Sequence, residues 1–168
     1  KVFIGTGDHI ALERPGYLGA IQAFSLYEPV FHPVNLNENG LDPVMLEQVL
    51  RSAPVRLFYG IPNSQNPSGI SYTEDCRRVL AEVFLKAGTR VIEDDAYGEL
   101  NFSGKVRSCM REYLPDQTII TGSFSKILAP GMRLGWIVAP ADIMEQLVIA
   151  KQASDLHSNY LSQRIAYQ

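Results

Sequence analysis

The order of elements is set by VRLFY (residues 55–59), TEDCRRVLAEVFLKAG (73–88) and RVIE (90–93). The first and third segments are short apolar runs containing β-branched and aromatic residues, which is typical of buried strands. The middle segment predicts a helix, because Thr73 can cap its amino end and Gly88 can end it. Strand, helix and strand in this order predict a parallel pair joined by a right-handed crossover.

The same alternation extends along the chain. Further strands are predicted at residues 9–13, 30–36, 118–122 and 134–138. Further helices are predicted at 16–27, from Asp42-Pro43 onward, from Pro140 onward and at 161–168. The predicted fold class is therefore α/β, a three-layer α/β/α arrangement with a mostly parallel sheet. Strands 118–122 and 134–138 lie too close for a helical crossover, so one is antiparallel to its neighbours or the two are not adjacent.

Apolar residues at helical spacing predict which helix faces are buried. For the helix at 73–88 the predicted inner face is Cys76, Val79, Leu80, Val83, Phe84 and Ala87. For the helix that begins at Pro140 it is Ile143, Leu147 and Val148.

Composition excludes several classes of protein. The chain has 168 residues, and its net charge of 15 − 18 = −3 gives no basic field for nucleic acid or an anionic membrane. Its two cysteines form no disulfide framework, and no apolar run approaches a membrane span. We expect a cytoplasmic protein that binds neither nucleic acid nor membrane. The chain begins without Met and ends within a predicted helix, so we interpret residues 1–168 as one domain core truncated at both ends.

Polar side chains gather just after the predicted strands, where ligands bind in sheets of this class. These residues are Tyr17, Asn66, Asp94, Tyr97, Ser123, Ser125, Lys126 and Arg133. Small residues and hydroxyls at 122–126 suit a phosphate, and Arg133 would add a fixed positive charge. A carboxylate at a strand end needs a cationic partner, which a protonated ring nitrogen would provide.

Each feature also has a structural interpretation. A run such as Asn66–Gly69 is most often a simple turn, and the turn Ser123–Lys126 could be a helix cap with a surface lysine. Tyr17 and Tyr97, each taken singly, would be interpreted as core aromatics. The carboxylates Glu93–Asp95 could form a solvated loop or a site for a hard cation, but no second acidic cluster or paired His accompanies them, and we predict no metal site. His9 and His32 are interpreted as structural or surface residues.

Taken together, these motifs resemble the large-domain core of class I/II aminotransferases, which are fold type I pyridoxal-phosphate-dependent enzymes. The matching stretches are Asn66–Gly69, Asp94–Tyr97, Ser123–Lys126 and Pro130–Gly135, in the order and at spacings similar to those of the family. The similarity covers essentially the whole chain. Residues 14–24 and 150–157 resemble a narrower group that contains 2-aminoadipate and kynurenine aminotransferases and the aminotransferase-like domains of bacterial transcription regulators.

The resemblance implies a role for each candidate residue. Lys126 would form the internal aldimine with pyridoxal 5'-phosphate, and Asp94 would pair with the pyridinium nitrogen. Tyr97 and Asn66 would hydrogen-bond the phenolic oxygen, and Tyr17 would stack on the ring. Ser123, Ser125 and Arg133 would hold the phosphate. Asp95 has no such role and is interpreted as structural.

The implied activity is ping-pong transamination between an amino acid and a 2-oxo acid, in a homodimer. The family's N-terminal phosphate-binding turn and its C-terminal substrate-binding arginine have no counterpart in these residues. We therefore expect the isolated chain to be inactive. The alternative function is a cofactor-binding sensor domain of a winged-helix transcription regulator, whose DNA-binding part would precede Lys1.

Overall fold

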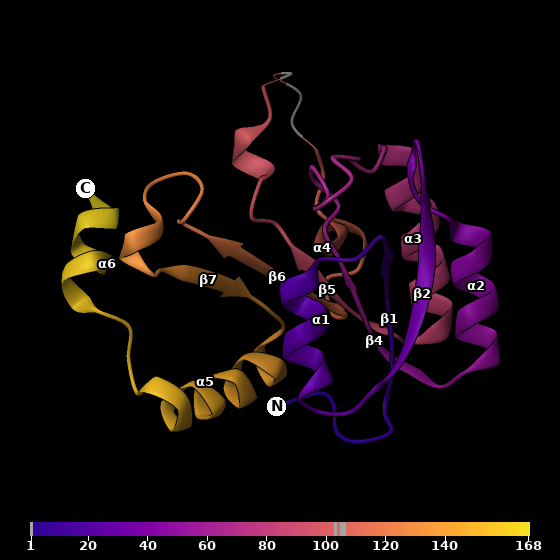
Figure 1. The fold of residues 1–168 in the computed structure, drawn as a ribbon, viewed down its shortest axis with the longest axis horizontal. Coiled ribbons are helices and arrows are strands. Elements are labelled where there is room, and N and C mark those ends of the chain that lie inside the picture. The colour runs from indigo at the N-terminus through magenta and orange to yellow at the C-terminus, as the bar shows by residue number, and fades with distance from the viewer. Residues whose placement is uncertain (1, 103, 105–106) are drawn as a thin grey trace.

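The computed structural model describes residues 2–102, 104 and 107–168. In this part of the chain, seven strands form one sheet in the order β3-β2-β1-β4-β5-β6-β7 (Figure 1). The strands are β1 (His9–Arg14), β2 (Val30–Asn37), β3 (Gly40–Leu41), β4 (Val55–Gly60), β5 (Arg90–Asp94), β6 (Thr118–Ser123) and β7 (Gly135–Val138). Neighbouring strands from β2 to β6 pair in parallel, whereas β3 and β7 run antiparallel to β2 and β6.

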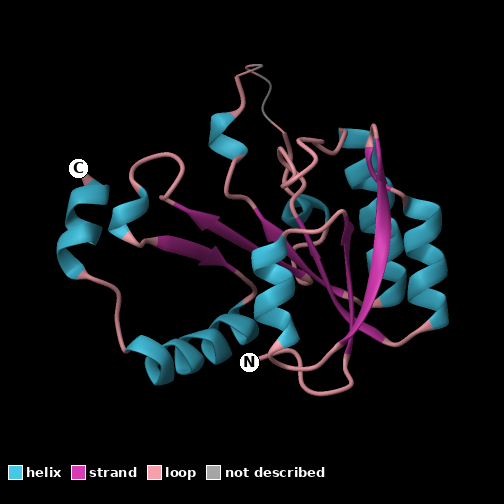
Figure 2. Ribbon diagram, viewed as in Figure 1, coloured by secondary structure: helices cyan, strands magenta, loops and turns pink. Residues whose placement is uncertain are grey.

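Helices cover both faces of the sheet (Figure 2). They are α1 (Leu18–Ser25), α2 (Pro43–Ser52), α3 (Glu74–Ala87), α4 (Met110–Tyr113), α5 (Ala141–Asp155) and α6 (Tyr160–Tyr167), with 3-10 turns η1 (Gly98–Leu100) and η2 (Pro130–Met132). Within the described residues, no helix combines the length and the apolar character needed to cross a bilayer.

Two apolar clusters lie on opposite sides of the sheet. Leu80 and Phe84 of α3 pack against Ala11 and Phe58, in a cluster that also contains residues of α2 and α4. Phe24 of α1 packs with residues of the other cluster, which includes Ile10 and Leu57. Because successive side chains of a strand point to opposite faces, residues 10 and 11, and likewise 57 and 58, divide between the clusters. The predicted α/β/α layering is confirmed.

The residues that begin α2 and α3, and the glycine that ends α3, are those that the sequence predicts. Asp42 accepts hydrogen bonds from the backbone N–H groups of Val44 and Met45, and Thr73 accepts one from Cys76. Gly88 ends α3 in the left-handed conformation, with φ of 65°. The strand predicted at 134–138 is β7, which pairs antiparallel with β6 and thereby settles the open alternative.

The predicted faces of the helices were partly wrong. Val79 and Ala87 of α3 are exposed, because the helix turns Arg77 and Ala81 inward beside Leu80 and Phe84. On α5, Ile143 is buried but Val148 is exposed. The pattern also missed β3, whose two residues are too few to show periodicity, and α4.

A stacked pair of histidines joins β1 to β2, which agrees with the structural interpretation of both. The ring centroids of His9 and His32 are 5.0 Å apart, and His9 Nδ1 lies 2.8 Å from His32 Nε2. One nitrogen must donate and the other accept, so a proton on both rings would abolish the bond. Burial, followed by the neighbouring His9, lowers the pKa of His32.

We predict that His32→Gln reduces the loss of stability in mild acid. Because the folded-state pKa of His32 is lowered, the unfolded chain binds the proton more readily. The contribution of His32 is therefore present above about pH 6.5 and lost as the pH falls below that value. Urea unfolding at about pH 7.5 and about pH 5.5 measures both free energies. An equal loss in the wild type and the variant would contradict the prediction.

Candidate active site

One cavity at the carboxyl edge of the parallel strands collects the predicted residues. It has a volume of about 400 Å³. All eight candidates line it, namely Tyr17, Asn66, Asp94, Tyr97, Ser123, Ser125, Lys126 and Arg133, together with Ile61, Ala96 and Pro130. They come from segments after β1 and β4 and from the ends of β5 and β6, as expected for parallel strands whose carboxyl ends share an edge.

Asp94 contributes a carboxylate to the cavity from the end of β5. Its Oδ2 accepts a hydrogen bond from the Tyr59 hydroxyl of the adjacent strand β4, at 2.5 Å. Burial raises the pKa of Asp94, and the nearby Asp95 raises it further, while the hydrogen bonds from Tyr59 and Thr121 oppose this rise. No described Lys, Arg or His forms an ion pair with Asp94. The half-buried carboxylate is thus suited to a cation that enters the cavity.

Lys126 and Tyr97 contribute an amine and a phenol to the cavity. Lys126 Nζ lies 5.9 Å from the centroid of the Tyr97 ring. Tyr97 is held by the turn that follows β5, in which Asp95 donates its backbone N–H to Thr121 O at 2.7 Å. The lysine amine and the phenol therefore face a common space from two different loops.

The loop after β6 brings two hydroxyls and a guanidinium to the same cavity. Ser125 donates its backbone N–H to Ser123 Oγ at 3.1 Å, and Phe124 N–H donates to Leu134 O at 3.1 Å, which closes the loop. Arg133 ends η2 in the left-handed conformation, with φ of 52°. Two hydroxyls and one guanidinium in a short loop form a suitable cradle for a phosphate.

Tyr17 forms the wall opposite these loops. It precedes α1, and its ring packs over Gly19, where an added Cβ would lie 2.8 Å from the ring Cζ. A glycine in the first turn therefore makes room for the flat ring. Tyr17 is 39% exposed and lines the cavity, so a ligand can reach its side chain there.

The three adjacent carboxylates do not converge on a shared ligand. Glu93 points to Arg77, with 3.5 Å between its Oε1 and Arg77 Nη1. Asp94 contacts Tyr59, and Asp95 Oδ1 accepts a hydrogen bond from Asn63 Nδ2 at 2.8 Å. The described residues contain no group of three His, Cys, Asp or Glu arranged to hold a metal. Each of the three carboxylates thus has a partner of its own on a different element.

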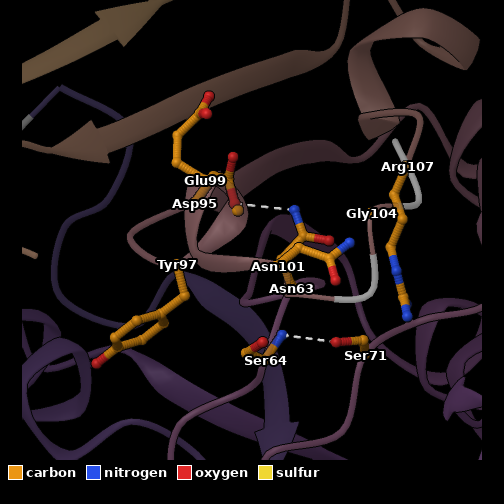
Figure 3. Close-up of a pocket in the computed structure, with 10 residues that line it drawn as sticks. Asn63, Ser64, Ser71, Asp95, Tyr97, Glu99, Asn101, Gly104 and Arg107 are labelled. Atoms are coloured by element: carbon orange, nitrogen blue, oxygen red, sulfur yellow. Dashed lines mark hydrogen bonds between the residues drawn. The ribbon is translucent and has the colours of Figure 1, made fainter. Parts of the chain in front are cut away.

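A second polar cavity of about 400 Å³ lies beside the first, and Tyr97 lines both. Figure 3 shows Asn63 reaching toward Asp95 across it, and the bond from the Ser64 N–H to Ser71 Oγ at 2.8 Å. An added Cβ at Gly98 would collide with the Asp95 carboxylate. Asp95 thus stabilises the turn that carries Tyr97, in agreement with its structural interpretation.

Sequence reasoning missed the buried polar residues behind the cavity. Tyr59 contacts Asp94, and Glu13 and Gln65 hold the loop that carries Asn66. Arg77 is fully buried and donates to Pro62 O, Tyr72 O and Ser108 O and to Asn63 Oδ1. The one available signal in the sequence was Arg77, a charged residue at helical spacing from Leu80 and Phe84 of α3. That signal did not extend to Tyr59, Glu13 or Gln65.

Comparison with known proteins is consistent with this geometry. A family model described as aminotransferase class I and II matches residues 2–167. The chain belongs to this family. The aromatic-amino-acid aminotransferase 1 of Thermococcus litoralis is 40% identical over all of the chain and 42% of its own length, and the 2-aminoadipate transaminase of Thermus thermophilus is 41% identical over all of the chain and 43% of its length.

Solved structures confirm the fold of this aminotransferase chain. The kynurenine aminotransferase of Pyrococcus horikoshii, solved in complex with PMP, superposes with a TM-score of 0.93 at 39% identity, covering 99% of this chain and 43% of its own. The chain thus spans less than half the length of these relatives. Its fold type and family, as the motifs implied, are both confirmed.

We predict that Glu93→Gln stabilises this aminotransferase chain increasingly as the pH rises from about 4.5 to about 7. Burial raises the pKa of Glu93 to about 7, although the Met110 N–H and Arg77 act in the opposite direction. Ionisation of Glu93 therefore opposes folding across this interval, and glutamine cannot ionise. Urea unfolding of the wild type and the variant at about pH 5 and about pH 8 measures the difference.

The control for this prediction is Glu82→Gln, since Glu82 is exposed on the same helix as Arg77. It should leave the pH dependence of unfolding as in the wild type. A difference between Glu93→Gln and the wild type that is equal at both pH values would contradict the assigned cause.

Proposed function

We propose that the complete protein containing this chain is a pyridoxal 5'-phosphate-dependent aminotransferase that transfers an amino group between an amino acid and a 2-oxo acid by a ping-pong mechanism. The observation that carries the proposal is the single cavity lined by all eight residues whose roles the motifs implied. Membership of the aminotransferase family supports the reaction class.

The donor set of the cavity fits this cofactor. Asp94 offers a carboxylate that no described cation neutralises, which suits a protonated ring nitrogen. Ser123, Ser125 and Arg133 offer the hydroxyls and the charge that a phosphate requires. Between these two ends, Tyr17 supplies a flat ring and Lys126 an amine. A cationic end, a flat middle and an anionic end describe this cofactor.

When bound, the cofactor supplies an electron sink that acidifies the substrate α-carbon. Asp94 would keep the ring nitrogen protonated, and Asn66 and Tyr97 would hydrogen-bond the phenolic oxygen. Lys126 would hold the cofactor covalently, and its amine, when free, would be the base that moves a proton from the substrate α-carbon to the cofactor.

Relatives named for aromatic amino acids, 2-aminoadipate and kynurenine support substrates with a long or aromatic side chain. We further propose a cytoplasmic homodimer, as the family resemblance implies.

The decisive experiment is Lys126→Ala in the complete protein. We expect the wild type to bind pyridoxal phosphate covalently, with a visible absorption band that borohydride reduction makes permanent. The variant should lose covalent attachment, and transamination should fall by at least about 10³-fold, since the nucleophile and base are one residue. Lys86→Ala, on the exposed end of α3, is the control and should behave as the wild type.

Two results would overturn this proposal. Covalent attachment that survives in Lys126→Ala would refute the lysine assignment. Covalent cofactor in the wild type without turnover of any amino acid and 2-oxo acid pair would favour the sensor alternative.

The adjacent carboxylates Asp94 and Asp95, at the end of β5, give a second test. Asp94→Asn should weaken pyridoxal phosphate binding by about ten- to hundredfold, the usual effect of losing a hydrogen bond to a charged group. Asp95→Asn should leave the affinity close to that of the wild type, because Asp95 accepts a hydrogen bond from Asn63 and does not line the cavity that contains Asp94 and Lys126. Equilibrium dialysis measures both affinities. Similar affinities for the two variants would contradict the role of Asp94.

A further inference from the structure

We propose that Glu13 and Gln65 form a buried positioning pair that fixes Tyr17 and Asn66, on the loops that follow the adjacent strands β1 and β4, at the separation the cofactor requires. This inference rests on the proposed function and adds two positioning residues to it. Neither Glu13 nor Gln65 lines the cavity, so both act through the residues that do.

Glu13 is the centre of the pair. It lies near the end of β1 with 1% of its surface exposed. Its Oε1 accepts hydrogen bonds from the Ile61 N–H at 2.9 Å and the Tyr72 hydroxyl at 2.6 Å. Its Oε2 accepts one from Gln65 Nε2 at 2.9 Å. Burial raises the pKa of Glu13 and these three donors oppose the rise, so the carboxylate depends on them for compensation.

Gln65 connects this carboxylate to both loops. Its Nε2 also donates to Pro15 O at 2.8 Å, two residues before Tyr17. Its Oε1 accepts from the Ser68 N–H at 2.9 Å and the Ser68 hydroxyl at 2.6 Å, two residues after Asn66. Both donors and both acceptor positions of the amide are therefore used, and the side chain is 1% exposed. A fully satisfied, buried amide has one favourable orientation, which transmits a fixed geometry.

The loop that carries Asn66 has a second attachment. Arg77 donates to Pro62 O and Asn63 Oδ1 at its beginning and to Tyr72 O at its end. Removing the Gln65 amide therefore leaves the loop joined to the fold and keeps its backbone bonds between residue 65 and residues 69 and 70, but it breaks the side-chain link from this loop to Glu13 and Pro15 O. For this reason we expect a Gln65 variant to fold and to lose mainly the placement of Asn66 and Tyr17.

The test uses the complete protein with Gln65→Met, which keeps the length of the side chain and removes its hydrogen bonds. We expect pyridoxal phosphate to bind about ten- to hundredfold more weakly. At saturating cofactor, the visible circular dichroism of the bound cofactor should also be reduced, because it reports the asymmetric contact with Tyr17. A purely structural role would lower the melting temperature and leave both signals intact.

The matched control is Gln117→Met. Gln117 Nε2 also donates to two backbone carbonyls, Phe84 O at 3.3 Å and Thr89 O at 3.0 Å, but at the opposite edge of the sheet. We expect it to lower stability without changing cofactor affinity or dichroism. Equal effects of Gln65→Met and Gln117→Met on affinity would overturn the inference.

If Gln65→Met folds poorly, a second test exchanges the two side chains of the pair between positions 13 and 65. Glu13→Gln sets two amide donors against each other, and Gln65→Glu sets two carboxylates against each other. The double variant restores one donor opposite one acceptor between the two side chains, with the polarity reversed, whereas the bond to Pro15 O stays lost because a carboxylate cannot donate it. It should bind the cofactor more tightly than Gln65→Glu alone, and a double variant no better than that single variant would refute the pair.

Failure of this inference differs from failure of the proposed function. A wild type without covalent cofactor at Lys126 refutes the function and the pair together. A wild type that binds, and a Gln65→Met variant that binds equally well, refutes the pair alone.

Discussion

The loop between β4 and α3 is held by one buried carboxylate on one side and one buried guanidinium on the other. Glu13 accepts from the Ile61 N–H, Gln65 and Tyr72, while Arg77 donates to the carbonyls of Pro62 and Tyr72. Tyr72 joins the two groups, since its hydroxyl serves Glu13 and its carbonyl serves Arg77. Buried backbone groups need hydrogen-bond partners, and at Ile61, Pro62 and Tyr72, the buried ends of this loop, charged side chains supply them instead of a β-ladder. The position of Asn66 in the cavity depends on this arrangement.

Such an arrangement is costly to bury. Moving a charge from water into the protein costs about several kcal/mol of solvation even after the protein relaxes. A well-packed apolar pair in the same place would avoid this cost. The gain is a defined geometry, because each bond of Arg77 and Glu13 has a direction that packing alone lacks. We interpret these groups as fixing the shape of the loop more than as adding to stability. The same reasoning applies to Tyr59, which orients Asp94 from the neighbouring strand.

The sheet explains why the remaining candidates meet. Parallel strands β1, β4, β5 and β6 all end at one edge, so the residues that follow them converge although they are far apart in sequence. Antiparallel β7 returns from that edge, and Gly122 allows its Trp136 to pack closely, because an added Cβ would collide with the indole ring. The loop from Ser123 to Arg133 is thereby folded back over the cavity.

The sequence by itself determined the class of the fold, nearly every strand, and eight of the eleven residues that line the cavity. It could do so because strand and helix periodicity is local, and because ligands in parallel sheets collect where strands end. Only the tertiary structure decided which polar groups stand behind the cavity. The bonds from Tyr59 to Asp94 and from Gln65 to Glu13 span 35 and 52 positions of sequence, so no local pattern announces them. The divergence of Glu93, Asp94 and Asp95 was also invisible in the sequence, because each direction is set by a partner on a different element.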